Sequence, residues 1–254
     1  MPEYRIYEFK TPNNNSNLKD KIVDIMPKVG IILIVLVLAA TFTNLFQKPL
    51  AILIAYPIFI MSLVLHELSH AYMADFLGDP TPRLTGRLTL NPLKHLDLWG
   101  TLLFIFCHFG WAKPVQVNAS YFKKPDRAMV SVALAGPLCN FLLAIISVVT
   151  LKIVFFFTRD ELISTIAFNI CYFGASVNIL LAVFNLIPIP PLDGSRLVHY
   201  LLPARYKANY YKFAQEYALF IMIFVFMYAG RMIGPVADRI TYYLFSLVGL
   251  NFFR

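Results

Sequence analysis

The stretch that decides the fold class is the run from Pro49 to Phe76, which reads PLAILIAYPIFIMSLVLHELSHAYMADF. Its first part, Pro49–Val64, contains no charged residue. As a helix, the run would be about 42 Å long, enough to cross about 30 Å of hydrocarbon. Before it ends, it carries His66, Glu67 and His70. Ionisable side chains inside a membrane are costly and usually functional, so the run predicts a membrane-spanning helix that carries a functional site.

The composition of the whole chain also indicates a membrane protein. Of its 254 residues, 59% are hydrophobic and 14% are charged, whereas a soluble domain averages about 25% charged. So little polar surface cannot cover a water-soluble core of this size, and a disordered or collagen-like chain is excluded. The cysteines are odd in number and form no CxxC pair, which argues against a disulfide scaffold. We predict buried thiols at Cys107, Cys139 and Cys171.

The apolar runs predict an all-α membrane protein with six transmembrane helices. These form a single membrane-embedded domain, residues 29–254, after a polar leader, residues 1–28. The mixed segment between the second and third helices contains a strand-like stretch, Arg87–Leu90, and an apolar patch, Leu102–Phe109. This patch is too short to span the bilayer as a helix, so we expect a re-entrant or interfacial segment. The six predicted spans are about 29–46, 49–76, 128–157, 162–187, 213–232 and 234–253.

The distribution of basic residues predicts the orientation in the membrane. Seventeen of the 22 Lys and Arg residues lie in the leader, in segment 77–127, in segment 188–212 and at the C-terminus. The other loops and the helix interiors hold the remaining five. This alternation fits six helices with both termini in the cytoplasm of a cell membrane. The net charge of +8 is therefore read as a topology signal, and no nucleic-acid partner is predicted.

The sequence His66-Glu67-Leu68-Ser69-His70 is an HExxH motif on a predicted helix. Residues four apart lie on one helix face, so both imidazoles can reach a single metal ion. Glu67 is placed to take a proton from a metal-bound water. The competing structural interpretation is an interhelical polar network built from the same side chains.

A catalytic zinc site needs a third protein ligand and an open position. Asp193 is favoured on topology, because the second and fourth predicted helices leave the membrane on the same side, which puts Asp193 and the HExxH motif in one leaflet. Asp75 shares a helix with His70 but is poorly placed to turn toward the same metal. The residues considered for this role are Asp75, Asp79, His95, Asp97, His108, Asp193 and His199.

Asn185–Gly194 reads NLIPIPPLDG. Together with the HELSH sequence, this resembles the site-2 protease family of intramembrane zinc metalloproteases. Three further motifs match in order, so the resemblance covers about Leu65 to Arg196. It fits the compact members that lack PDZ and CBS modules. These motifs are Asn91–Asp97 (NPLKHLD), Gly110–Val115 (GWAKPV) and Ala135–Asn140 (AGPLCN).

The resemblance implies a role for each matching residue. His66, His70 and Asp193 would hold one Zn²⁺ per chain, and Glu67 would be the general base. Asn140 and Asn185 fall on family asparagines that either contact the substrate carbonyl or oxyanion or form interhelical hydrogen bonds. The segment 86–117 resembles a membrane-associated β-hairpin, whose edge would pair with an unwound substrate. The roles of His95, Asp97 and His108 stay open.

The predicted function is an intramembrane metalloendopeptidase that cleaves transmembrane protein substrates, with its active site toward the cytoplasmic side. Without an in-chain PDZ or CBS module, regulation would fall to a membrane partner or to a lateral opening between helices. One alternative is a membrane metal transporter, but this needs polar residues spread through the depth of several helices. Another is a non-catalytic zinc-binding scaffold, which has no use for Glu67.

Overall fold

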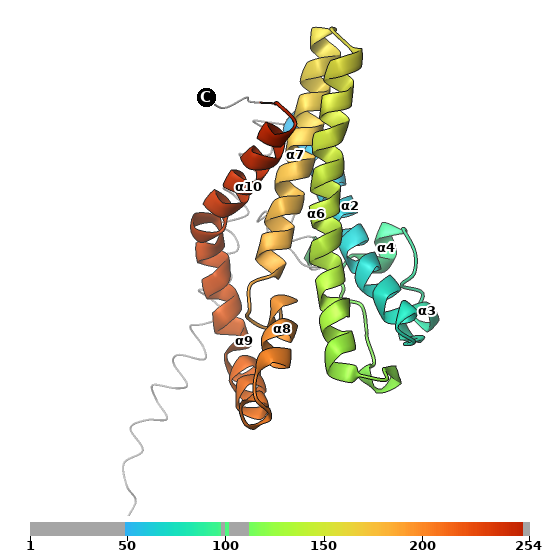
Figure 1. Ribbon diagram of the computed structural model, residues 1–254, viewed down its shortest axis with the longest axis vertical. Helices are drawn as coiled ribbons and strands as arrows, with labels where there is room; N and C mark the ends of the chain where they lie inside the picture. Colours follow the sequence, from blue (N-terminus) through green and yellow to red (C-terminus); the bar gives the residue numbers. More distant parts are fainter. Residues whose placement is uncertain (1–48, 98–99, 102–111, 251–254) are drawn as a thin grey trace, which may run out of the picture.

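The computed structural model describes residues 49–97, 100–101 and 112–250, and every named element among them is a helix (Figure 1). Several predicted features lie outside the described residues. They are the leader 1–28, the first helix 29–46, and the patch Leu102–Phe109 with Cys107 and His108.

Three of the described helices are long and apolar enough to cross a membrane. Helix α2, Pro49–Phe76, has the predicted bounds. Helices α6, Pro125–Phe157, and α7, Glu161–Asn185, form a long hairpin, and α2 packs against both (Figure 1). Asp160 caps the start of α7, since its side chain accepts a hydrogen bond from the Ile163 N–H at 2.8 Å.

The surface of this hairpin is strongly apolar. Large hydrophobic side chains of α6 and α7 point outward in the described part of the chain, in numbers that a water-exposed surface does not tolerate. They include Phe141, Leu142, Ile146, Val149, Ile153, Phe156, Phe157, Leu162, Ile163 and Ile166. The protein is therefore a membrane protein whose hairpin surface suits lipid tails.

Small residues at several core positions allow the helices to pack closely. The core between α6, α7 and α10 is lined mostly by small and branched side chains, which let helix backbones approach one another without polar contacts. Its buried members are Ala144, Val148, Leu151, Cys171, Ala175, Ile179, Ala237, Phe245 and Leu250. Cys171 is thus a buried thiol, as predicted, whereas Cys139 is only partly buried.

The C-terminal part differs from the prediction in its boundaries. A short helix that was not predicted, α8 (Gly194–Leu201), follows α7. Helix α9 (Ala204–Met232) begins nine residues earlier than predicted, because a helix can continue through polar and aromatic residues that hydropathy does not count as a span. Helix α10 (Gly234–Leu247) ends earlier, near Gly249, whose φ of +77° lies in the left-handed region. Its 14 residues rise only about 21 Å, so six spanning helices are not confirmed.

The predicted strand at Arg87–Leu90 is wrong. These residues form bends between two one-turn helices, α3 (Thr81–Leu84) and α4 (Pro92–His95). The backbone carbonyl of Thr89 accepts a hydrogen bond from the His95 side chain, so it is not available to a neighbouring strand. Among the described residues of segment 86–117, the only trace of the predicted hairpin is an isolated antiparallel bridge between Leu96 and Ala112.

Candidate metal centre

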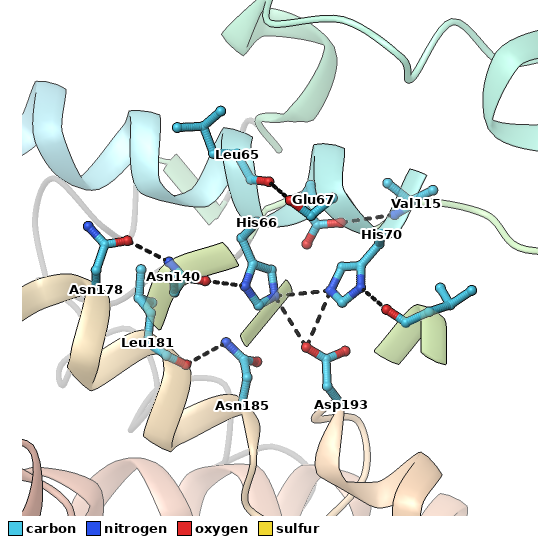
Figure 2. Close-up of polar contacts among 12 residues, drawn as sticks. Leu65, His66, Glu67, His70, Val115, Asn140, Asn178, Leu181, Asn185 and Asp193 are labelled. Atoms are coloured by element: carbon cyan, nitrogen blue, oxygen red, sulfur yellow. Dashed lines mark hydrogen bonds and ion pairs between the residues drawn. The ribbon is translucent and has the colours of Figure 1, made fainter. Parts of the chain in front are cut away.

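Three side-chain donor atoms from two distant parts of the chain meet beside α2 (Figure 2). The Nε2 atoms of His66 and His70 lie 3.1 Å apart. Oδ2 of Asp193 lies 3.2 Å from the His66 nitrogen and 3.3 Å from the His70 nitrogen. Both imidazoles are buried, with 4% and 8% of their residue surface exposed. The geometry thus brings together the two histidines of the HExxH motif and the aspartate that was favoured as their partner.

The hydrogen bonds on the far side of each ring fix where its proton lies. His66 Nδ1 is 2.5 Å from Oδ1 of Asn140, and His70 Nδ1 is 2.7 Å from the backbone carbonyl oxygen of Val132. Both partners are oxygens that only accept, so in a neutral ring Nδ1 carries the proton. Each Nε2 then presents a lone pair, and the close contacts between the three donor atoms contain no proton to share.

Three converging lone pairs are the donor set of a cation site. The Oδ2 atom of Asp193 is buried without a hydrogen-bond donor among the described residues, which leaves it free to bind a cation. Zinc–ligand distances of about 2.0–2.1 Å give a tetrahedron with edges of about 3.3 Å. The observed separations of 3.1–3.3 Å fit three corners of it and leave the fourth open.

One face of α6 shapes the centre from the other side. Val132, Gly136 and Asn140 follow one another at intervals of four residues, so they share this face. Val132 and Asn140 bind the two histidines, and Gly136 lies between them. A Cβ atom at Gly136 would come within 2.5 Å of His66 Cε1 and 2.5 Å of His70 Nε2. Only glycine permits this close approach of α6 to the imidazoles.

A second glycine positions the carboxylate. Asp193 lies in the turn between α7 and α8, followed directly by Gly194. A Cβ atom at Gly194 would lie 2.3 Å from the backbone oxygen of Leu186 and 2.6 Å from that of Ile187. The absence of a side chain thus lets the start of α8 fold back against the end of α7, which carries Asp193 to the histidines.

Glu67 lies beside the three donor atoms. Its Oε2 accepts a hydrogen bond from the Val115 N–H at 3.1 Å (Figure 2). The side chain is only half-buried, and it lines a cavity of about 270 Å³ together with His66, His70, Asp193 and Asn185. A carboxylate held at the wall of a cavity that also contains a metal site can exchange protons with a water there.

The part of the chain that matches a known protein family includes the residues of this centre. The family model of peptidase family M50 matches residues 54–158 and 152–229, which include the HExxH motif and Asp193. The chain belongs to peptidase family M50, the site-2 protease family. It is therefore a zinc metalloprotease, and the family implies zinc. His66, His70 and Asp193 form a possible site for this ion.

Relatives of this M50 peptidase carry the words zinc metalloprotease in their names. YwhC of Bacillus subtilis (strain 168) is 40% identical over 183 residues, covering 70% of this chain and 83% of YwhC. Rip2 of Mycobacterium tuberculosis (strain ATCC 25618 / H37Rv) is 31% identical over 200 residues, covering 76% of this chain and 73% of Rip2. MJ0392 of Methanocaldococcus jannaschii is 26% identical over 146 residues, covering 58% and 33%. No solved structure gives a significant match.

The two asparagines expected either to contact substrate or to form interhelical hydrogen bonds lie in different surroundings beside the candidate metal centre. Asn140 is fully buried, and its Oδ1 is engaged by His66 while its Nδ2 donates to Asn178 Oδ1 at 2.7 Å. Asn185 lines the cavity, and its Nδ2 donates to the Leu181 carbonyl oxygen at 3.0 Å. Asn140 thus contacts His66, and of the two asparagines Asn185 is the one that lines the cavity.

The other residues considered as ligands have different partners. Asp75 receives two hydrogen bonds from Arg83, at 3.0 and 2.7 Å. Asp79 is fully buried and accepts from the backbone N–H groups of Thr81 and Asn118, among others. Asp97 Oδ1 accepts from the Gly100 N–H at 2.9 Å. His95 and His199 lie apart from the cluster of His66, His70 and Asp193.

Two residues that pack or bond around the candidate metal centre were not predicted from the sequence. Gly136 was noted only as part of a motif, and Asn178 was not singled out. Asn178 Nδ2 donates to Ser62 Oγ at 2.9 Å, which links α7 to α2. A signal was present: Asn178 is a polar residue within an apolar helix, seven positions and about two turns before Asn185, so both share a helix face.

Proposed function

We propose that the chain is an intramembrane endopeptidase that hydrolyses a peptide bond in or near the transmembrane segment of membrane-protein substrates. The observation that carries this proposal is the depth of the metal centre. His66 and His70 lie within a candidate membrane span, Leu53–Phe76. They precede its end by ten and six residues, which is about 15 and 9 Å along the axis. A protease with its centre at this depth meets peptide bonds inside or just below the bilayer surface.

In this proposal His66, His70 and Asp193 hold one zinc ion per chain. A zinc ion held there would act as a Lewis acid toward the scissile carbonyl and would make a water more acidic. Glu67 takes a proton from the attacking water and later delivers it to the leaving amine nitrogen. Oε2 of Glu67 already accepts from the Val115 N–H, so we assign the proton transfer to Oε1.

The two asparagines then receive different roles. Asn185 borders the cavity and is placed to donate to the oxygen of the scissile carbonyl as charge develops on it. Asn140 is buried behind His66, so it orients the imidazole and does not contact substrate. The two asparagines thus have different roles, because one amide faces the cavity and the other faces a histidine.

A substrate helix must unwind locally, because a helical peptide bond engages its own carbonyl. The segment Lys113–Asn118 is irregular and runs past Glu67. Pro114, Val115 and Val117 line the same cavity as the metal donors. We propose that the edge of this segment pairs with the unwound substrate backbone as an added strand.

The proposed topology keeps six crossings with both termini in the cytoplasm and the active site toward that side. The support is the basic residue distribution together with the position of the centre near the α2 end that leads into the basic segment 77–127. With the three native cysteines replaced by serine, accessibility of a single cysteine introduced at Arg159 or Arg205 to a membrane-impermeant reagent tests it. Reaction of Arg205→Cys from the outside would contradict it.

The decisive experiment measures zinc per chain in purified protein, comparing wild type with Asp193→Asn. Asp238→Asn is the matched control, because Asp238 is an exposed aspartate on α10. We expect one zinc in wild type and in the control, and weakened or lost zinc in Asp193→Asn. Cleavage of single-span peptides in liposomes must then follow zinc content. Zinc flux across reconstituted vesicles without any cleavage would instead support a transporter and overturn the proposal.

A further inference from the structure

We propose that Asn178 is a positioning residue that fixes the amide orientation of Asn140 and thereby the tautomer of His66. The inference rests on the zinc site of the proposed function. It concerns four buried polar side chains from three helices, which we call the relay: Ser62 and His66 of α2, Asn140 of α6 and Asn178 of α7. All four are at most 4% exposed.

The orientation of the relay is set at its outer end. Asn178 Nδ2 donates to the backbone oxygen of Gly174 at 2.8 Å and to Ser62 Oγ at 2.9 Å. The Gly174 carbonyl can only accept. The Ser62 hydroxyl gives its own proton to the Ile58 carbonyl oxygen at 2.8 Å, so its oxygen is also an acceptor here. Two acceptors therefore hold the amide nitrogen of Asn178 on this side, and its Oδ1 must face the opposite way.

That orientation passes to His66 in two steps. Oδ1 of Asn178 accepts from Asn140 Nδ2 at 2.7 Å, so the Oδ1 of Asn140 is turned toward His66. There it lies 2.5 Å from Nδ1 and requires a proton on that nitrogen. Nε2 of His66 is then left with the lone pair that zinc needs (Figure 2). The reversed Asn140 amide would present an N–H to Nδ1, and the ring proton would move to Nε2 and block the ligand.

The neighbouring histidine shows why the relay is needed. His70 Nδ1 binds the backbone oxygen of Val132, which can only accept and cannot turn round. His66 instead binds a side-chain amide, whose two ends are similar in shape and opposite in hydrogen bonding. The Asn140 amide can therefore adopt two orientations, and its hydrogen bond to Asn178 fixes one of them.

The test is the zinc affinity of Asn178→Ala, measured by competition with a chelator. Asn169→Ala is the matched control, because Asn169 lies on the same helix, is exposed and bonds only to the Thr165 carbonyl one turn earlier in the described contacts. We expect affinity to fall about 10–100-fold in Asn178→Ala, the range typical of partners behind metal ligands, and to be unchanged in Asn169→Ala. Wild-type affinity in Asn178→Ala would overturn the proposal.

A second background separates orientation from packing. In Asn140→Asp, the carboxylate has no N–H to donate to Asn178 Oδ1, and either of its oxygens can accept from His66 Nδ1. Asn178 therefore no longer determines which atom faces His66. Adding Asn178→Ala to Asn140→Asp should therefore leave zinc affinity as it is in Asn140→Asp alone. An equal loss in both backgrounds would mean that Asn178 acts by packing, and would overturn the proposal.

A conservative variant covers the case in which Asn178→Ala does not fold. A protonated carboxyl in Asn178→Asp can donate to Gly174 and accept from Asn140, so we expect zinc affinity within a few-fold of wild type. A loss in Asn178→Asp as large as in Asn178→Ala would contradict the relay. If wild type itself binds no zinc, the proposed function fails. If wild type binds zinc and Asn178→Ala binds it equally, only this inference fails.

Discussion

Two regions of the molecule bury histidine, and they use it in different ways. In the metal centre, His66 and His70 direct Nδ1 outward to oxygen acceptors and turn Nε2 toward each other and toward Asp193. In the segment that follows α2, His95 is 0% exposed, and its Nε2 lies 2.8 Å from the Thr89 carbonyl oxygen. All three rings are buried, so burial alone does not distinguish a ligand from a structural residue.

The two regions differ in what the polar atoms of their side chains bind. Around His95, side chains end on backbone groups: Arg87 donates to the Lys94 and Lys113 carbonyl oxygens, and Lys113 N–H donates to the His95 carbonyl oxygen. Such bonds tie residues 87–95 and Lys113 to one another. In the metal centre three acceptors converge with no proton among them, which is unfavourable unless a cation is bound. Convergence of unprotonated donors, and not burial, marks the functional site.

The largest expected effect comes from Gly136→Ala, which removes the space that lets the donors converge. The new Cβ would lie 2.5 Å from a ring atom of each histidine, one of them the His70 Nε2 donor. We expect zinc binding and proteolysis to fall below detection. Gly234→Ala is the control, since a Cβ there meets nothing within 4 Å. Zinc content by mass spectrometry checks this, and a full complement of zinc in Gly136→Ala would contradict the close approach of α6.

Glu67→Gln should separate chemistry from metal binding. The Gln side-chain oxygen can still accept from the Val115 N–H, so the geometry and zinc content should stay as in wild type. Loss of the proton acceptor should slow peptide cleavage by about 10²–10⁴-fold. The rate of cleavage of a single-span peptide in liposomes measures this, with zinc content as the control. Cleavage at the wild-type rate would remove Glu67 from the role of general base.

Features of the fold and of the site that depend on a local sequence pattern could be predicted. The bounds of α2 follow from its hydropathy, and the shared face of His66 and His70 follows from helical spacing. The choice of Asp193 used the side of the membrane on which two helices end, together with the family resemblance of residues 185–194. Boundaries set by polar residues failed, as in the early start of α9 at Ala204.

Contacts between helices could not be predicted in the same way. Asn140 and Asn178 are 38 residues apart, and their hydrogen bond depends on the rotation of α6 against α7. The need for glycine at position 136 depends on the distance between α6 and α2. The sequence pattern shows which residues are polar or small, but only packing decides whether an asparagine faces a substrate or the back of a histidine.

Asn185→Ala should have a smaller effect than Glu67→Gln. Asn185 lines the cavity without contacting a metal donor in the described contacts, so zinc affinity should be unchanged. Loss of one donor to a developing oxyanion typically slows catalysis by about 10²–10³-fold. The cleavage rate at saturating peptide concentration measures this. A rise in KM alone would assign Asn185 to substrate binding, and a loss of zinc would place it with Asn140 behind the ligands.

The smallest effect on the centre is expected from His95→Gln, which tests the structural side of the comparison. The change removes a buried ring whose Nε2 bonds to the Thr89 carbonyl oxygen, which should lower the free energy of unfolding by about 1–3 kcal/mol. Zinc per chain should stay at the wild-type value, because His95 is not part of the cluster formed by His66, His70 and Asp193. Thermal unfolding and zinc content of the same sample check both. If zinc were lost while the unfolding temperature held, His95 would belong with His66 and His70, and the distinction drawn from converging lone pairs would be wrong.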